Sequence, residues 1–344
     1  MSRRSLTLLI ASVGTAVAIA VSVLVPVPYV ILGPGPTLNT LGKDSSGHPL
    51  ITISGRASYP TSGHLNMVTV SYQGCQGDRF NIFTALVAWL NPHEAVVPET
   101  EICPAGQTQK QTQQQDTQQM TSSQQTATAA ALTELHIPYS TQVVVVQAEK
   151  GFPAYGVLKA GDVITAVDGK PVTSQTALTS LIFAQPAGSA LTLSITRKGQ
   201  RQQVQVRTRA SGGHPVMGVE ISGQYKFPFM VRISVGDIGG PSAGMMFALA
   251  IVDKLTNRDL TGGKFIAGTG EITAGGQVQA IGGIQQKMIG AHNAGATIFL
   301  TPASNCADTK GAVPAGLRLV KVSTLTQAVD DLEAIKAGKS VPSC

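Results

Sequence analysis

A single uncharged apolar run near the start of the chain limits what this sequence can fold into. The run, Leu6–Val25, reads LTLLIASVGTAVAIAVSVLV. A helix of about twenty such residues spans roughly 30 Å, which is the thickness of the hydrocarbon core of a bilayer. Arg3 and Arg4 precede it, and basic residues favour the cytoplasmic side, so the rest of the chain is expected outside the cytoplasm. No second run is long enough to span, which excludes a multi-span protein.

A cleaved signal peptide is the alternative for this run. The triplets AVA and AIA inside it offer small-residue cleavage sites. The run is longer than the apolar region of about 7–15 residues that signal peptides carry, which favours an uncleaved anchor. Residues 1–5 are then a cytoplasmic stub and residues 6–25 a transmembrane anchor. Both alternatives place the bulk of the chain outside the cytoplasm.

Composition limits the classes of partner. The 25 basic and 19 acidic residues are scattered, and aromatic residues make up only 5% of the chain. A nucleic-acid surface needs a basic stripe or a platform of stacking side chains, and neither is found here. We therefore expect no nucleic-acid partner.

The four cysteines favour disulfides over a metal site. They form no CxxC motif and have no His pairs nearby, which disfavours zinc. An even number in an oxidising compartment suggests two bridges, for which three pairings exist. Proximity in the sequence favours Cys75–Cys103 and Cys306–Cys344. Four free buried thiols are the alternative.

The segments after the run differ in composition. Residues 26–43 are rich in Pro and Gly and are expected to form an extended stalk. Residues 44–106 hold β-prone stretches and a helical spacing at 79–90. Residues 107–140 begin with a Gln-rich stretch that could be disordered or an interaction tract. Because it runs into the helix-forming 127–135, a long exposed polar helix is favoured.

Residues 141–210 contain KAGDVI (159–164) and VDGKPV (167–172) in a strand–helix–strand–strand order. These motifs resemble the turn and hairpin of a PDZ domain of the bacterial type. Gly161 permits the tight turn, and Asp162 can bond nearby amides. The resemblance implies a groove that binds an extended peptide by strand addition. Its expected lining is Val143, Val144, Val145, Val146, Leu178 and Ile182. No GLGF-like loop precedes Val143, which leaves recognition of free carboxyl termini open.

The strongest chemical signal is GGPSAG at residues 239–244. It brings Ser242 to the start of an apolar helix, where unpaired amides and the positive end of the helix dipole gather. These are the parts of an oxyanion hole beside a serine nucleophile. A plain helix-capping serine is the alternative. The motif also fits the nucleophile elbow of α/β-hydrolases, but only His292 follows and too little chain remains for that fold.

Lys287 is the candidate base. A serine without a histidine can use a buried neutral lysine. Lys287 lies on an expected helix at 283–292 beside Ile284, Met288 and Ile289, which would lower its pKa by desolvation. Snorkelling of the amine to solvent is the alternative.

Three motifs follow one another within residues 211–335: GGPSAG, TGEIT (269–273) and GGIQQKMIGAHNAGA (282–296). In order and spacing they resemble the proteolytic domain of Lon proteases. The resemblance implies that Ser242 is the nucleophile and Lys287 the general base, with Thr269 orienting the amine. Further supporting candidates are Gly240, Ala243 and Asp237. Cytoplasmic Lon has an acidic residue three positions before the serine, where this chain has Gly239.

The whole chain is similar to the membrane-anchored, PDZ-containing Lon-like proteases of bacteria. This implies an α+β fold in which a Lon-type proteolytic domain (211–344, completed by 44–106) carries an inserted PDZ domain, preceded by one N-terminal transmembrane helix. No GxxxxGK[ST] motif occurs, so an ATP-independent serine endopeptidase is expected. It would cleave unfolded or flexible extracytoplasmic or membrane proteins without a cofactor, with the PDZ domain docking or gating substrate. A homo-oligomer is possible by the same resemblance. The alternative is an inactive envelope scaffold that binds peptides through its PDZ domain.

Overall fold

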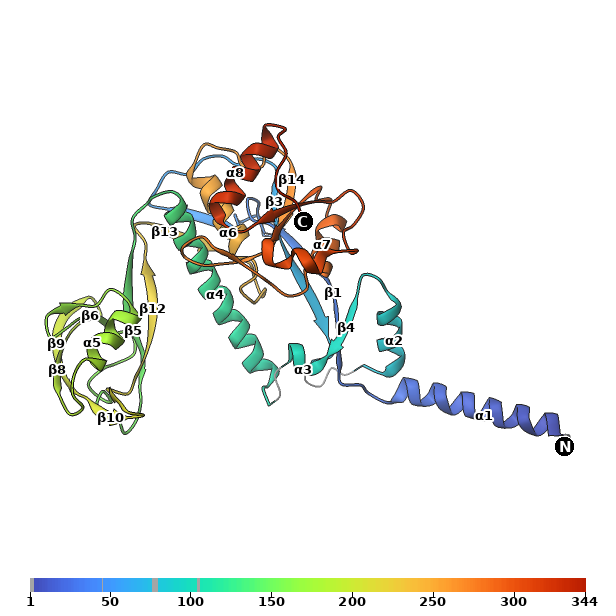
Figure 1. Cartoon of the computed structure of the whole chain (residues 1–344), viewed down its shortest axis with the longest axis horizontal. Coiled ribbons are helices and arrows are strands. Elements are labelled where there is room, and N and C mark those ends of the chain that lie inside the picture. The colour runs from blue at the N-terminus through green and yellow to red at the C-terminus, as the bar shows by residue number, and fades with distance from the viewer. Residues whose placement is uncertain (1–2, 45, 76–79, 104–105) are drawn as a thin grey trace. The chain divides into compact units, whose positions relative to one another are not determined.

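The chain folds into two compact units, one of which is inserted into the other (Figure 1). The computed structural model describes residues 3–44, 46–75, 80–103 and 106–344. The discontinuous unit comprises Met1–His136 and Phe229–Cys344, and the inserted unit comprises Ile137–Pro228. This confirms the mixed fold with an insertion. Residues 1–2 of the expected cytoplasmic stub and Arg79 of the expected helix at 79–90 lie outside the described residues.

The apolar run near the amino terminus forms helix α1 (Arg3–Leu24), in which no residue is buried. In the described part of the chain it is the one helix long and apolar enough to cross a bilayer. Length and composition alone fit either a membrane span or a signal sequence, so both alternatives from the sequence stay open at this level.

A six-stranded sheet forms the centre of the discontinuous unit, in the order β18-β17-β14-β3-β1-β4. β3, β14, β17 and β18 run parallel to one another, whereas β1 is antiparallel to both of its neighbours. The strands are β1 (Tyr29–Asn39), β3 (His64–Gln73), β4 (Ala95–Pro98), β14 (Phe265–Gly268), β17 (Ile298–Pro302) and β18 (Arg318–Val322). Two short pairs accompany the sheet, β2 (Ile51–Ser54) with β13 (Met230–Ile233) and β15 (Glu271–Ile272) with β16 (Val278–Gln279).

The stalk expected at residues 26–43 is wrong, because most of it is β1. This strand is paired on both edges, and Val30 is fully buried. Proline has no N–H to donate to a neighbouring strand, so the prolines of this segment argue against a strand that is paired on both edges. The structure accommodates Pro34 and Pro36 at a register shift between Pro34 and Thr37, where the ladder is already interrupted.

Helices cover this sheet and supply its core. They are α2 (Ile82–Leu90), α3 (Glu99–Ile102), α4 (Gln109–Glu134), α6 (Gly244–Leu255), α7 (Ile284–Asn293) and α8 (Leu325–Lys336), with a short 3-10 helix at Ala303–Thr309. α6 is the central helix, since all its residues except Lys254 are buried. Its apolar sequence all round is what a helix enclosed by protein requires.

The Gln-rich stretch is helical, as expected, and is not fully exposed. α4 begins with a capping box, in which Thr108 and Gln111 bond each other's backbone amides. Eight of its 26 residues are buried, namely Met120, Ser123 and the run Ala127–Leu132. α4 packs on α6, because the small alanine side chains let the two helices approach closely.

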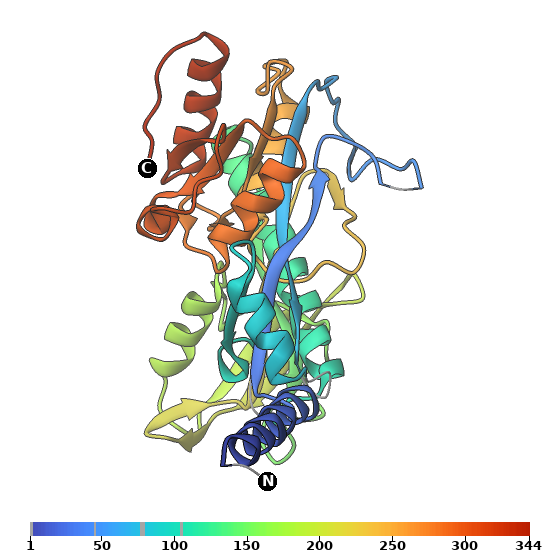
Figure 2. The ribbon, with the colours of Figure 1, turned by 90° about the vertical axis from the view of Figure 1, so that its right-hand side faces the viewer.

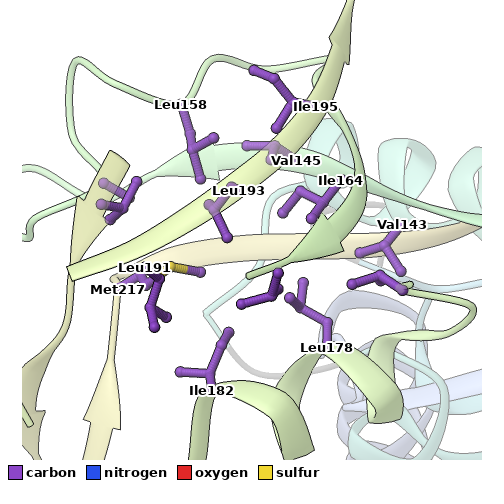
Figure 3. Packing of buried hydrophobic residues seen from close by; sticks show 14 residues of the cluster. Val143, Val145, Leu158, Ile164, Leu178, Ile182, Leu191, Leu193, Ile195 and Met217 are labelled. Carbon is purple, nitrogen blue, oxygen red and sulfur yellow. The ribbon is translucent and has the colours of Figure 1, made fainter. Parts of the chain in front are cut away.

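The inserted unit is a six-stranded sheet with one helix; five strands follow the order β12-β5-β6-β8-β9, and β7 pairs with β6. Its main elements are β5 (Ser140–Ala148), β6 (Val163–Val167), α5 (Gln175–Phe183), β8 (Ala190–Arg197), β9 (Gln200–Arg207) and β12 (Val219–Lys226). Short strands β7 (Lys170–Pro171), β10 (Arg209–Ser211) and β11 (His214–Val216) complete it. Figure 3 shows apolar side chains of the sheet, such as Leu193 and Ile195, gathered over Leu178 and Ile182 of α5. The unit extends past residue 210 because β12 pairs with β5.

Two disulfides link segments of the discontinuous unit. Cys75 is bonded to Cys103, and Cys306 to Cys344. This is the pairing that proximity in the sequence favoured. The first joins the segment after β3 to the segment after α3, and the second ties the carboxyl end of the chain to the 3-10 helix.

Candidate active site

Ser242 lies in the turn between β13 and α6, one residue before the helix cap Ala243. Gly240 has a φ of +85°, a backbone conformation that favours glycine, and it makes the turn that leads into the helix. α4 holds this turn from outside through two hydrogen bonds. Ser123 Oγ donates to the carbonyl oxygen of Pro241 at 2.9 Å, and the Gly240 amide donates to that of Asp116 at 3.1 Å.

The TGE motif fixes the backbone of Ser242. The Thr269 hydroxyl donates to the carbonyl oxygen of Ser242 at 3.0 Å, and the Gly270 amide donates to the same oxygen at 2.8 Å. Thr269 is fully buried. The expected hydrogen bond between Thr269 and the lysine amine is therefore wrong, because the hydroxyl bonds the Ser242 carbonyl oxygen instead. A buried hydroxyl must satisfy its hydrogen bond, and here it positions the serine backbone.

Lys287 reaches Ser242 from α7. Its Nζ donates to Ser242 Oγ at 2.9 Å, although the two residues are 45 positions apart in the sequence. The Lys287 side chain is only 4% exposed. Burial lowers the pKa of its amine to about 8, because the charged form loses its hydration. α7 itself begins after Gly283, whose φ is +66° and where a side chain would meet Val70.

A cleft of about 480 Å³ opens onto this pair, and Ser242 and Lys287 both line it. The supporting candidates Gly240, Ala243 and Asp237 line it too, and Asp237 is exposed. Among the described residues, the amides of Ser242 and Ala243 donate to no other group, and both stand at the start of α6. The cleft therefore combines a hydroxyl, a buried amine and amides at a positive helix end.

Asp116 is a cleft residue that sequence reasoning missed. It comes from α4, its side chain is half-buried, and burial raises the pKa of its carboxyl. A Cβ at Gly239 would lie 2.5 Å from the Cβ of Asp116. Asp116 thus occupies the space beside Gly239, three positions before Ser242. The available signal was weak, because Asp116 is simply the one acid within the Gln-rich stretch 107–125.

The sequence places the peptide groove of the inserted unit along β5, and this prediction is wrong. Val143, Val144 and Val145 are buried, and β5 is paired on one edge with β6 and on the other with β12. A strand with both edges occupied cannot accept a peptide. Val146, also on β5, is 43% exposed.

A cavity of about 370 Å³ lies instead beside α5 and the segment leading into β12. The expected Leu178 and Ile182 do line it, together with Phe183, Met217 and Val219. β12 is the edge strand on this side of the sheet in the described chain. The alternating sequence of Val219–Lys226 was the signal for this strand, and it lies beyond the expected domain end at residue 210.

Comparisons with known proteins show two regions of similarity. Residues 231–335 match the Lon protease (S16) C-terminal proteolytic domain, and residues 112–208 match the PDZ domain. Lon protease 1 of Bacillus subtilis is 34% identical over 119 residues, which is 33% of this chain and 15% of that protein. Lon protease of Chloroflexus aurantiacus is 31% identical over 178 residues, 49% of this chain and 19% of that protein. The chain thus spans less than a fifth of these relatives.

Solved structures with similarity include PDZ domains. The PDZ domain of an SdrC-like protein from Listeria monocytogenes is 26% identical, with a TM-score of 0.22 over 23% of this chain and 85% of that one.

Proposed function

We propose that this chain, which contains a Lon-type proteolytic domain and a PDZ domain, is a serine endopeptidase with Ser242 as nucleophile and Lys287 as general base. The observation that carries the proposal is the 2.9 Å contact between Lys287 Nζ and Ser242 Oγ inside a cleft. A lysine with a pKa of about 8 has a substantial neutral fraction near pH 7, roughly a tenth of the molecules. A fully hydrated lysine would have almost none.

The reaction proceeds in two steps. Ser242 Oγ attacks the carbonyl carbon of the scissile peptide bond, and the neutral Lys287 amine takes the hydroxyl proton. The amides of Ser242 and Ala243 bind the oxyanion that forms. The protonated amine then gives its proton to the departing amine, leaving an ester on Ser242. Water attacks this ester as Lys287 takes one of its protons, and Lys287 then gives that proton to Ser242 Oγ as the carboxylic product leaves.

Hydrolysis is proposed to be independent of ATP, so substrates are unfolded or flexible chains that enter the cleft unaided. The inserted unit docks or gates such chains along its cavity. α1 anchors the protein in a membrane, with the two units outside the cytoplasm. The two disulfides support an oxidising location. A homo-oligomer stays a prediction that a molar-mass measurement in detergent would test.

The test uses the full chain in detergent with an unfolded casein and no ATP. The parent should cleave it and Ser242→Ala should not, while the exposed Ser234→Ala serves as a matched serine control and should cleave normally. Equal cleavage by Ser242→Ala would refute the nucleophile. A parent that binds casein but cleaves nothing would favour an inactive scaffold.

Docking by the inserted unit has its own test. Phe183 is 45% exposed and lines the cavity, whereas Tyr155 is 55% exposed in the same unit and does not. Phe183→Ala should raise KM for casein several-fold, because about 1 kcal/mol of binding free energy is lost with the side chain. The kinetics with a short peptide substrate should not change. Tyr155→Ala should change neither. Unchanged casein kinetics in Phe183→Ala would count against this cavity as the docking site.

A further inference from the structure

α2 exposes a concentrated apolar surface. Six of its nine residues are large apolar side chains open to solvent: Ile82, Phe83, Leu86, Val87, Trp89 and Leu90. Trp89 is 70% exposed, and Ala88 is the one buried residue of the helix. Outside α1, no other described helix or strand has more than one exposed large apolar side chain. A soluble surface rarely leaves such a patch uncovered, so something of low polarity covers it.

Main-chain bonds attach α2 to the point where the chain leaves α1. The Val27 amide donates to the carbonyl oxygen of Phe80 at 3.0 Å, and Pro26 forms an isolated antiparallel bridge with Asn81. α1 ends at Leu24 and α2 begins directly after Asn81. The two helices also contact each other, and α2 lies beside the carboxyl end of α1 in both views (Figures 1 and 2).

The chemistry of α2 and its surroundings suits the surface of a bilayer. Residues 80–92 contain no charged side chain, and Val25 and Tyr29, both exposed, continue the apolar surface from α1. Tryptophan is favoured where membrane meets water. We propose that α2 is a second membrane contact, lying in the bilayer interface beside α1 with Trp89 among the lipid chains. This rests on the proposed anchoring by α1.

A second copy of the chain is the competing occupant. The bonds at Val27 and Asn81 favour lipid, because they hold α2 within a few residues of the expected membrane exit. A short apolar helix fixed there cannot avoid the headgroup region if α1 spans the bilayer. The contact would also bring one end of the cleft near the membrane. Leu32 and Tyr72 line the cleft as partners across β1 and β3, and Leu32 is roughly 10 Å along the strand from Tyr29.

Trp89 is the single tryptophan of the chain, so native fluorescence reports on α2 directly. The full chain is placed in phosphatidylcholine vesicles whose acyl chains carry bromine near the headgroup or near the chain end. We expect loss of most Trp89 emission with the shallow bromines and less with the deep ones. The control is Trp89→Phe with Tyr59→Trp. Tyr59 is exposed beyond the His64 end of β3, a strand length of roughly 30 Å from α2, and its emission should persist.

A pair of charge variants tests the surface itself. Leu86→Asp should weaken quenching of Trp89, because a carboxylate resists entry into lipid. Val313→Asp, at an exposed apolar position of the same unit, should leave quenching unchanged. Equal quenching in Leu86→Asp and the parent would count against the proposal.

Extraction of the vesicles with alkaline carbonate tests α1 separately. Retained protein with unquenched Trp89 would overturn the α2 contact and leave the anchor standing. Extracted protein whose Trp89 is quenched whenever vesicles are present would support α2 without the anchor. If bromine does not quench the Trp89 emission, and the emission shifts to shorter wavelength as the protein concentration rises, a second copy of the chain covers the surface. That result would overturn the proposal.

Discussion

A buried ionisable side chain lies in the candidate active site of the discontinuous unit and another in a turn of the inserted unit, and the two have opposite kinds of hydrogen-bond partner. Lys287 in the discontinuous unit is 4% exposed, and its hydrogen-bond partner is the neutral hydroxyl of Ser242. Asp162 in the inserted unit is 1% exposed and receives bonds from Arg197 at 2.7 and 2.6 Å and from the Lys159 amide at 2.8 Å.

The pKa shifts follow from these partners. Burial without a counter-charge lowers the pKa of Lys287 to about 8. Burial alone would raise the pKa of Asp162, but its bonds to Arg197 and Lys159 outweigh burial, so the net shift is downward. An unpaired buried group is ready to exchange a proton near neutral pH, whereas a paired one stays charged and holds a turn. The comparison therefore separates a reactive site from a structural one.

The largest effect should come from Lys287→Met, which keeps the side-chain length and apolar packing but removes the amine. Loss of a catalytic base typically costs about 10³-fold or more in kcat, and we expect this size for a short peptide. Lys254→Met is the matched control, because burial also lowers the pKa of Lys254 but this side chain does not line the cleft. Circular dichroism should show both variants folded. Activity retained in Lys287→Met would remove the base from the mechanism.

The pH dependence should be the next largest effect. The neutral amine is the active form, so kcat/KM should fall about tenfold per unit of pH below the Lys287 pKa of about 8 and level off above it. The unfolded lysine keeps its proton up to its ordinary value of 10.5. Between about 8 and 10.5 the unfolded state binds the extra proton, so the free energy of unfolding should rise with pH. Chemical denaturation across this range should show a rise in the parent that Lys287→Met lacks.

Replacing Asp162, the buried group that is paired, should change stability alone. Asp162→Asn should cost the inserted unit about 2–3 kcal/mol, because Arg197 loses its charged acceptor while remaining partly buried. Thermal unfolding measures this, and kcat for a short peptide should stay unchanged. Asp168→Asn is the control, since Asp168 is exposed and its bond to the Thr192 amide can be kept by asparagine. If Asp162→Asn also lost hydrolysis of the short peptide, Asp162 could not be a purely structural group, and the distinction between the two regions would be wrong.

Local motifs explain what could be predicted from the sequence. GGPSAG specifies a glycine turn into an apolar helix, and the lysine motif places an amine among apolar neighbours, so Ser242 and Lys287 could each be singled out from their own segment. That the two form a pair was implied by the resemblance to Lon proteolytic domains and not by either segment. The helix at α4 was predictable in the same way from the helix-forming residues 127–135 at its end. The catalytic roles stay predictions until the variants above are measured.

Features that depend on pairing between distant segments were not predictable. The prolines of β1 fit a strand only because its partner shifts register there. The wrong groove strand has the same origin, since nothing within Val143–Val146 reveals that β12 occupies its edge. Thr269 was placed near the site correctly, but which acceptor its hydroxyl reaches depends on where the Ser242 carbonyl lies.

The smallest expected effect concerns Asp116, a cleft carboxylate that is neither fully buried nor paired with Lys287. When Lys287 is neutral, the charged side chains lining the cleft in the described chain are Asp116 and Asp237, which favours peptides with a basic residue near the cut. A half-exposed ion pair is worth up to about 1 kcal/mol, so Asp116→Asn should raise KM for such peptides by no more than about fivefold, with kcat nearly unchanged.

A matched acidic peptide shows whether this effect is electrostatic. Its KM should fall or stay constant in Asp116→Asn, because the variant removes a repulsion. Burial raises the pKa of Asp116, so the preference for basic peptides should weaken as the pH falls towards that raised value. Equal losses for basic and acidic peptides would instead mean that Asp116 acts through its contact with the Gly239–Gly240 turn. The acid supplied by α4 would then belong with Asp162 as a structural group.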